Sequence, residues 1–289
     1  MPHADIGGLR LFYQQTGQGP DVVLVHAVTG NLAVWMLTGL SESLGQNFRV
    51  TSYDLRGHGH SDVPAIGYTS ADMAEDFRQL HRKLGLRPAF LVGHSFGGVV
   101  ALHTASLYPD LVAGVIVADS YFPGLREIEP NIAQANIWTD LRTTFESASV
   151  ELPAEVDLSD LFRVVAKLTP GQSEQLDAKL GPFSRGWLRQ LPRLANTICG
   201  KEVFEVAGFD AARIAAVRQP VVALYDEHSP FHATCRYLEQ QLPNCTVEII
   251  PGAKHLALVQ NPAAFADAVS RHLRRMASEC ISSPSSSKT

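Results

Sequence analysis

Short, mainly apolar runs alternate along the chain with longer segments in which apolar residues recur at helical spacing. The first such run, residues 21–27, is almost wholly apolar and rich in valine. Runs of this kind are typical of strands that are buried on both faces of a parallel sheet. We expect further strands within residues 48–57, 89–95, 112–120, 220–227 and 245–252.

Three segments between these runs have the spacing of helices, namely residues 69–86, 96–110 and 262–276. Thr69 or Ser70 can cap the start of the first segment, and Gly85 suits its end. Pro262 suits the first turn of the last segment. Strands that alternate with helices predict an α/β fold, with a mostly parallel central sheet and helices on both faces.

Residues 121–210 interrupt this alternation, because they hold few strand signals and several helical patterns. We therefore predict a helical lid at 121–210, an α/β core of residues 1–120 and 211–278, and a disordered polar tail at 279–289. Most large aromatic residues of the lid are expected to form its own core, and a few to line an apolar pocket. They are Trp138, Phe145, Phe162, Phe183 and Trp187.

Composition and charge narrow the range of partners. Of the 289 residues, 45% are hydrophobic and 18% are charged, which fits a globular chain with a sizeable core. The net charge of -5 gives no reason to expect nucleic acid or an anionic membrane as a partner. The chain has no apolar stretch near the roughly 18 residues that a membrane span needs. We expect a small-molecule substrate and a monomer or homodimer.

The N-terminus and the cysteines predict a location. Residues 1–17 lack the charged start and apolar run of a secretory signal. The four cysteines, Cys199, Cys235, Cys245 and Cys280, have neither paired nor metal-binding spacing. We therefore predict free thiols, a cytoplasmic location, and neither a cofactor nor a metal ion.

A pentapeptide of the G-x-S-x-G type, residues 93–97, lies between a predicted strand and a predicted helix. In this pattern a tight turn exposes the serine hydroxyl, and small residues on either side let the strand and the helix approach closely. Gly93 and Gly97 meet that need. The N-terminus of the following helix points free N–H groups toward the reacting oxygen. The pattern predicts that Ser95 is a nucleophile.

This motif and three further segments make the chain resemble the α/β-hydrolase family over most of its length. Residues 23–31, VLVHAVTGN, are similar to the oxyanion loop of that family. Residues 53–62, YDLRGHGHSD, are similar to the loop after its fourth strand, and residues 251–262, PGAKHLALVQNP, to its histidine loop. The four segments occur in the order that the family has.

The resemblance implies an oxyanion hole formed by the main-chain N–H groups of Val28 and Phe96, which would stabilise charge on the substrate oxygen. Two positions depart from the family pattern. Ala27 stands in the oxyanion loop where glycine is usual, and Lys254 stands where glycine commonly precedes the histidine. The change at Ala27 predicts a slightly different oxyanion geometry.

A serine hydroxyl is a weak nucleophile until a base takes its proton, and position selects that base among 11 histidines. His255 follows the last predicted strand, so it should lie at the same edge of the sheet as Ser95. Other roles are expected for the remaining candidates: His94 packs or lines the pocket, His58 and His60 are structural, His26 is structural or contacts substrate, and His228 is exposed.

The base needs a carboxylate that fixes its tautomer and stabilises the imidazolium. Many relatives carry this acid after the strand at 220–227, but the family pattern there puts Ser229 at the position of the acid. Other relatives, such as one branch of the haloalkane dehalogenases, carry it after the preceding strand. In this chain that strand ends in Asp119, which lies 24 residues after Ser95.

Asp119 is therefore the first choice for the acid, Glu227 the second and Asp226 the third. Asp54 is expected to be structural. A serine–histidine dyad that works without an acid stays open, because loss of the acid weakens a triad without abolishing it.

These residues predict a serine hydrolase that cleaves an ester, a lactone or a thioester of a small to medium apolar substrate through an acyl-enzyme on Ser95. The serine disfavours epoxide hydrolysis and dehalogenation, which use an aspartate nucleophile in this family. A C–C bond hydrolase or a cyclase on the same fold is an alternative. A hydrolase-like ligand receptor with little turnover is another, supported by the missing acid and by Ala27.

Overall fold

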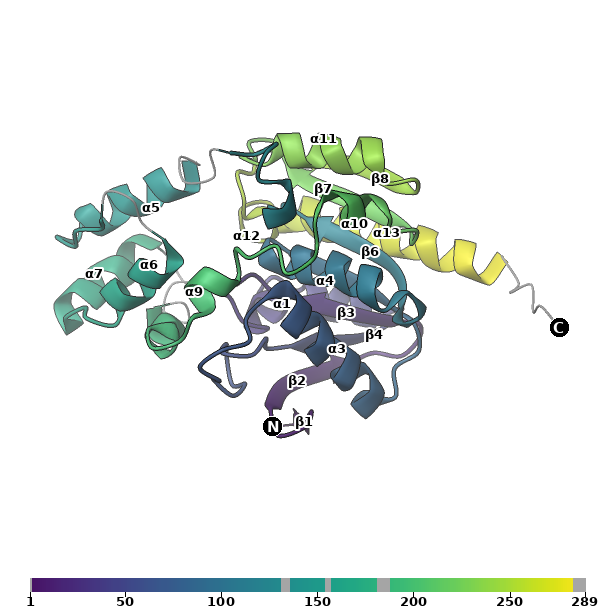
Figure 1. The fold of residues 1–289 in the computed structure, drawn as a ribbon, viewed down its shortest axis with the longest axis horizontal. Helices are drawn as coiled ribbons and strands as arrows, with labels where there is room; N and C mark the ends of the chain where they lie inside the picture. The colour runs from purple at the N-terminus through teal and green to yellow at the C-terminus, as the bar shows by residue number, and fades with distance from the viewer. Residues whose placement is uncertain (1, 131–135, 154–156, 181–187, 283–289) are drawn as a thin grey trace.

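A computed structural model of the chain describes residues 2–130, 136–153, 157–180 and 188–282, and these residues build an eight-stranded sheet (Figure 1). The strand order is β1-β2-β4-β3-β5-β6-β7-β8. Strands β3 to β8 run parallel, whereas β1 and β2 are antiparallel to their neighbours. The strands are β1 His3–Asp5, β2 Arg10–Thr16, β3 Asp21–Val25, β4 Arg49–Tyr53, β5 Ala89–His94, β6 Val112–Ala118, β7 Val221–Asp226 and β8 Cys245–Ile250.

The six strands that the apolar runs predict are all present, and the α/β fold is confirmed. Strands β1 and β2 were not predicted. Strand β2 is buried only at its start and ends in the exposed residues Gln15 and Thr16. Strand β2 lies one place in from the edge of the sheet and keeps polar side chains in water at its end. It therefore lacks the continuous apolar run that marks a central strand.

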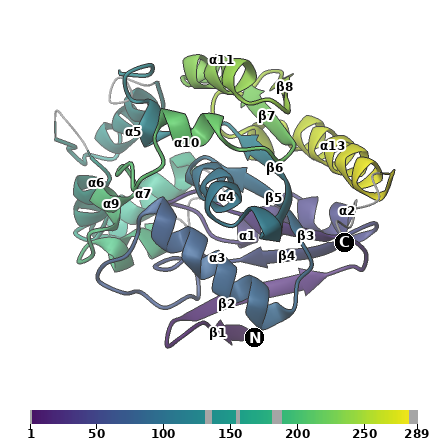
Figure 2. The same ribbon diagram turned by 45° about the vertical axis from the view of Figure 1, so that its right-hand side comes forward.

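Helices cover both faces of the sheet (Figures 1 and 2). In β3, Val23 and Val25 point into the core on one face, whereas Val22 and Leu24 point into the core on the other, as the alternation along a strand requires. The first core is shared with α3 Ser70–Leu84, α4 Phe96–Leu107, α10 Ala211–Ala215 and α11 His232–Gln241. The second is shared with α1 Ala33–Leu37, α2 Leu40–Gly45, α12 Ala257–Gln260 and α13 Pro262–Ser282.

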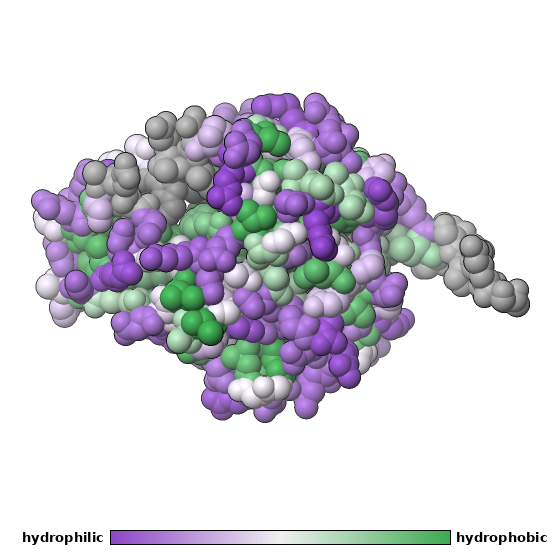
Figure 3. Space-filling model, in the orientation of Figure 1, coloured by the Kyte–Doolittle hydropathy of each residue, from purple (hydrophilic) through white to green (hydrophobic). Residues whose placement is uncertain are grey.

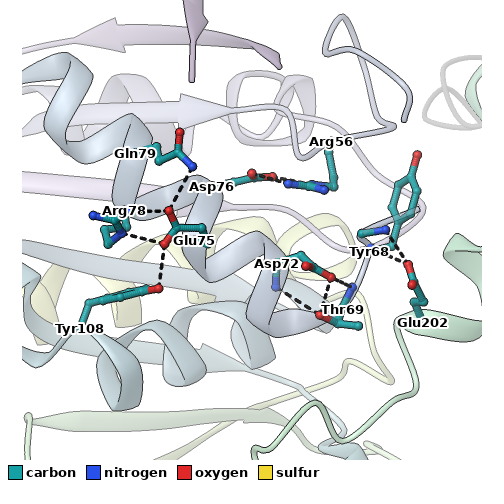
Figure 4. Close-up of polar contacts among 11 residues, drawn as sticks. Arg56, Tyr68, Thr69, Asp72, Glu75, Asp76, Arg78, Gln79, Tyr108 and Glu202 are labelled. Atoms are coloured by element: carbon teal, nitrogen blue, oxygen red, sulfur yellow. Dashed lines mark hydrogen bonds and ion pairs between the residues drawn. The ribbon is translucent and has the colours of Figure 1, made fainter. Parts of the chain in front are cut away.

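Helix α3 begins and ends where the sequence predicts. The Thr69 hydroxyl accepts a hydrogen bond from the N–H of Asp72 at 3.1 Å, and the Asp72 carboxylate accepts one from the N–H of Thr69, which completes a capping box (Figure 4). Gly85 ends the helix with a φ of 59°, a left-handed conformation that glycine adopts without steric cost. Further along the helix, Glu75 accepts a hydrogen bond from the Tyr108 hydroxyl at 2.8 Å and so joins α3 to the end of α4 (Figure 4).

The described part of residues 121–210 contains helices and turns but no strand. Its elements are η2 Pro123–Leu125, α5 Asn136–Glu146, α6 Leu158–Val165, α7 Pro170–Leu180, η4 Leu191–Leu194 and α9 Cys199–Glu202. Helices α5, α6, α7 and α9 lie together at one side of the sheet, opposite the end of α13 (Figures 1 and 2). Phe145 and Phe162 are fully buried. The side chains of Trp138, Phe183 and Trp187 lie outside the described residues.

Hydrogen bonds connect the second half of this helical segment to the loop after β4. The Arg193 guanidinium donates hydrogen bonds to the carbonyl of Gly59 and, at 3.1 Å, to that of Ser61. The Glu202 carboxylate accepts the N–H groups of Gly67 and Tyr68 at 2.9 and 2.7 Å (Figure 4). These contacts fix η4 and α9 to the core by charge-assisted hydrogen bonds.

Apolar side chains reach the surface where α9 meets this loop. Ile66 is 64% exposed and Ile198 is 41% exposed, and the N–H of Ile198 donates to the carbonyl of Ala65. Figure 3 shows hydrophobic residues gathered at the surface on the side of the molecule where α9 lies. The surface where the helical segment meets the core, around Ile66 and Ile198, is therefore partly apolar.

The expected boundary of the disordered tail is corrected by the structure. Helix α13 continues to Ser282, four residues into the segment 279–289, and the remaining tail residues lie outside the described ranges. Neither glycine nor proline occurs between Pro262 and Pro284, so the chain has no strong stop signal before the residue preceding Pro284. Among the helices of the described residues, none combines the length and the hydropathy that crossing a membrane requires.

Candidate active site

The carboxyl ends of three parallel strands bring the predicted nucleophile and acid to one edge of the sheet. Ser95 follows β5 directly, and its N–H donates to the carbonyl of Ala118 at 2.8 Å. Asp119 follows β6, and its N–H donates to the carbonyl of Leu224 in β7 at 2.9 Å. Ser95 and Asp119 thus follow neighbouring strand ends, at the edge where open parallel sheets carry their ligand sites.

Ser95 has the backbone of a strained turn, with a φ of 54° and a ψ of -122°. A serine with positive φ is uncommon, and such conformations cost on the order of 1–3 kcal/mol. Glycines on either side make the turn possible. A Cβ atom on Gly93 would lie 2.2 Å from the carbonyl oxygen of Gly97, and one on Gly97 would lie 2.2 Å from that of Val25. The strand and the helix therefore meet too closely for any side chain at these positions.

Gly97→Ala is expected to lower the free energy of unfolding by about 3 kcal/mol, because a methyl group there meets main-chain atoms that no rotamer change can move. Gly171→Ala in α7 is the matched control. A Cβ at Gly171 has nothing within 4 Å, so its change should stay within about 1 kcal/mol. Equilibrium urea unfolding measures both variants, and equal effects would contradict the packing argument.

His255 and Asp119 form a direct hydrogen bond across 136 residues of sequence. The Nδ1 atom of His255 lies 2.6 Å from Oδ2 of Asp119, whose side chain is 1% exposed. A carboxylate that accepts from Nδ1 fixes the tautomer in which Nε2 is free to take a proton. Phe231 packs edge-on against the imidazole with ring centroids 5.4 Å apart, which restricts the ring further. Asp119 also has a positive φ, 44°, so its backbone is strained like that of Ser95.

The other two candidate acids lie elsewhere. The Glu227 side chain is 51% exposed, and its carboxylate accepts the N–H of Gly252. Asp226 is buried, and its carboxylate accepts the N–H of Ala257 at 2.9 Å. Ser229, at the usual position of the acid, accepts the N–H of Phe231 with its hydroxyl. Among these groups, Asp119 is the one whose carboxylate hydrogen-bonds His255.

His94 holds the backbone of His255. The ring is 4% exposed, and its Nε2 lies 2.8 Å from the carbonyl oxygen of His255. Burial, helped by the nearby His255, lowers the pKa of His94 to about 4, so the ring is neutral and donates from Nε2. The sequence predicted that His94 packs or lines the pocket. The contact could not be predicted from the sequence, because its partner, His255, lies 161 residues away. The position of His94 directly before Ser95 is the one sequence feature that places it near the site.

The predicted oxyanion loop is held by two buried histidines. His58 places its Nε2 against the carbonyl of Val28 and its Nδ1 2.8 Å from the carbonyl of Arg56. His26 accepts the N–H of Leu55 at 3.0 Å, and its other ring nitrogen lies 2.7 Å from the carbonyl of Ala27. With 0% exposure and both nitrogens engaged, His26 is structural and leaves no atom for a substrate. Burial, with a smaller effect of His58, lowers its pKa to about 3.

Two more predicted roles can be compared with the structure. Asp54 is buried and accepts the N–H groups of Leu32 and His60 at 2.7 and 2.8 Å, which is a structural role. Phe96 is the first residue of α4, so its N–H belongs to the turn that has no intrahelical acceptor.

Lys254 connects the histidine loop to the helical segment. Its Nζ lies 2.9 Å from the Asp140 carboxylate of α5, and both side chains are more than half exposed. A pair this exposed contributes about 0–1 kcal/mol, so it adds little to the stability of the fold. Within the described ranges, no group of three His, Cys, Asp or Glu side chains is placed to hold a metal ion, and all four cysteines have free thiols.

Comparison with known proteins places these residues in a family context. The family model for the alpha/beta hydrolase fold matches residues 20–262. A pimeloyl-[acyl-carrier protein] methyl ester esterase of Vibrio atlanticus is 31% identical over 245 residues, which cover 76% of this chain and 92% of that enzyme. A 2-(acetamidomethylene)succinate hydrolase of Mesorhizobium japonicum is 40% identical over 115 residues, and this match spans only 41% of that enzyme. The enol-lactonase of Burkholderia xenovorans superimposes with a TM-score of 0.69 at 21% identity, over 94% of this chain and 100% of the other.

Proposed function

The chain belongs to the α/β hydrolase fold family, and on this premise we propose that it is a serine hydrolase that cleaves an ester, a lactone or a thioester. The observation that carries the proposal is the 2.6 Å hydrogen bond between His255 and Asp119, at the sheet edge where Ser95 occupies its strained turn. A base with a fixed tautomer at the same sheet edge as a serine on a strained turn is the arrangement that acyl transfer through serine requires.

In the proposed reaction, the Ser95 hydroxyl attacks the substrate carbonyl while His255 takes its proton at Nε2. Asp119 stabilises the imidazolium, and the N–H groups of Val28 and Phe96 bind the oxyanion of the tetrahedral intermediate. The C–O or C–S bond then breaks, and the leaving alcohol or thiol receives the proton from His255. Water, deprotonated by His255, attacks the acyl-enzyme, and its collapse releases the acid and returns the proton to Ser95.

Three observations support a small to medium apolar substrate. Phe231 packs on the ring of His255, and Leu256, the next residue after the base, is 44% exposed. The exposed side chains of Ile66 and Ile198 add apolar surface beside the helical segment, which we propose acts as a lid. Two of the relatives named above are an ester hydrolase and a lactonase, so the same bond types are proposed for this chain.

The placement of Asp119 favours turnover over a ligand receptor. The receptor hypothesis depended on the missing acid after β7, and a buried carboxylate from the neighbouring strand stands at hydrogen-bonding distance from the base instead. Cleavage of a C–C bond uses a similar set of residues, so a panel of esters, lactones and β-diketones is the substrate comparison that separates these reactions.

An active-site phosphonate is expected to label the folded protein with one adduct, which peptide mass spectrometry should locate on Ser95. The physical reason is that only a serine activated by a base attacks phosphorus rapidly. Ser173→Ala in α7 is the matched control and should label like the wild type. A folded wild-type protein that hydrolyses none of the panel and takes up no phosphonate would refute the proposal.

A further inference from the structure

Asp226 is a buried carboxyl group that the proposed reaction does not use. It ends strand β7 and is 2% exposed. Its Oδ2 accepts the N–H of Ala257 at 2.9 Å, and its own N–H donates to Oδ1 of Asp119 at 3.1 Å. Ala257 lies two residues after His255, so Asp226 contacts the acid through its main chain and the loop of the base through its side chain.

The contact with Ala257 complements the one made by His94. His94 binds the carbonyl of His255 at 2.8 Å, and Asp226 binds the N–H of Ala257 at 2.9 Å. The loop is therefore held at two main-chain atoms, one on the side of the nucleophile and one on the side of the acid. A buried carboxyl group is costly unless its hydrogen bonds are made, so its presence here calls for a function that an apolar residue would not supply.

We propose that Asp226 is a positioning residue, which holds the loop of His255 so that the base stays correctly placed between Asp119 and Ser95. The inference rests on the proposed function for its kinetic consequences. Asp226 touches no reacting atom in this scheme. It acts through the backbone of the loop, where a displacement of the base by about 1 Å can lower the rate about 100-fold.

The charge state of Asp226 follows from its surroundings. Burial, and then the charge of Asp119, raise the pKa of Asp226 to about 7, whereas the Ala257 N–H and the ring of His255 oppose this shift. Below that pH the Asp226 carboxyl is neutral. Above it, Asp226 carries a negative charge close to Asp119 and to the loop of His255.

The raised pKa of Asp226 predicts how its contribution to the free energy of unfolding changes with pH. A carboxyl group that titrates near 4 when unfolded and near 7 when folded contributes stability below about pH 4, and this contribution is lost as the pH rises through 7. Asp226→Asn should therefore resist urea better than the wild type at pH 8, and the advantage should disappear below about pH 4.

The kinetic test compares Asp226→Ala, Asp226→Asn and Glu227→Gln in ester hydrolysis. Glu227 is the matched control, because its carboxylate also accepts an N–H of this loop, that of Gly252, but does so at the surface. Asp226→Ala should lower kcat about 10- to 100-fold with KM within about twofold, since the base is displaced while the pocket remains. Asp226→Asn keeps an acceptor for Ala257 and should recover most of kcat. Its pH profile of kcat should differ from that of the wild type near and above pH 7, where only the wild type carries a charge at this position. Glu227→Gln should match the wild type.

A readout without turnover separates this inference from the proposed function. In hydrogen exchange of the full chain, residues 253–260 should lose protection in Asp226→Ala and keep it in Glu227→Gln. If Asp226→Ala fails to fold, the pH profile of Asp226→Asn decides. Unchanged exchange, a kcat of Asp226→Ala within twofold of the wild type, or superimposable pH profiles would overturn the role of Asp226. A wild type without hydrolase activity whose loop still depends on Asp226 would overturn the proposed function alone.

Discussion

Replacement of Ser95 by alanine is expected to lower kcat for ester hydrolysis by roughly 10⁴- to 10⁶-fold, the range that loss of a nucleophile produces in a triad. The variant keeps the backbone conformation, in which Ser95 has a φ of 54°, with a side chain that the turn accommodates. Substrate binding should change little, because the substitution removes a single hydroxyl and leaves every other side chain in place. The measurement is kcat and KM for a chromogenic ester, with purified variant and wild type at equal concentrations.

Ser173→Ala, at a partly buried position of helix α7, is the control for any general effect of losing a hydroxyl and should keep wild-type kcat. A fall of less than about tenfold in Ser95→Ala would mean that the reaction does not pass through an acyl-enzyme on this residue. A direct attack by water, activated by His255, would then be the mechanism to test.

Asp119→Asn is expected to lower kcat about 10³- to 10⁴-fold. An asparagine amide at this position can donate to Nδ1 of His255 through its nitrogen, and that hydrogen bond fixes the tautomer whose Nε2 already carries a proton. The base then cannot accept the proton of Ser95. The same pH-dependent kinetics should be followed for wild type and variant, because the loss should persist at every pH where the protein is folded.

Glu227→Gln is the matched change for the acid as well, since it also converts a carboxylate into an amide in the neighbouring strand connection. Its side chain is half exposed and bonds the N–H of Gly252, so kcat should stay within about twofold of the wild type. If Asp119→Asn kept full activity while Glu227→Gln lost it, the acid would have to be reassigned to Glu227, with a rearranged loop.

The sequence predicts best those features that depend on local rules. A central strand is apolar on both faces, so residues 21–27 and 89–95 could be recognised without any partner strand. The turn at Ser95 requires small neighbours, and Gly93 and Gly97 display that requirement directly. Asp119 could be proposed as the acid because it is the polar residue that directly follows an apolar strand one crossover after the nucleophile.

Contacts between a side chain and a distant main-chain group could not be predicted, for a physical reason. His94 and Asp226 hold a carbonyl and an N–H of the His255 loop, and every residue except proline offers these same groups. The residue whose main-chain group is bound can be of almost any type, so no sequence pattern predicts these contacts. The strand of residues 10–16 was missed for a related reason. Its backbone pairs with β4, but its last side chains are polar, so the sequence shows no apolar run there.

The anchoring of the His255 loop through main-chain atoms has a consequence for how this protein can be diversified. Lys254 and Leu256 flank the base, and both are exposed, yet neither side chain takes part in the bonds to His94 or Asp226. Residue identity at these two positions can therefore be randomised in a library while the base remains aligned. Lys254, which stands where the family commonly has glycine, is already one natural example of such variation beside His255.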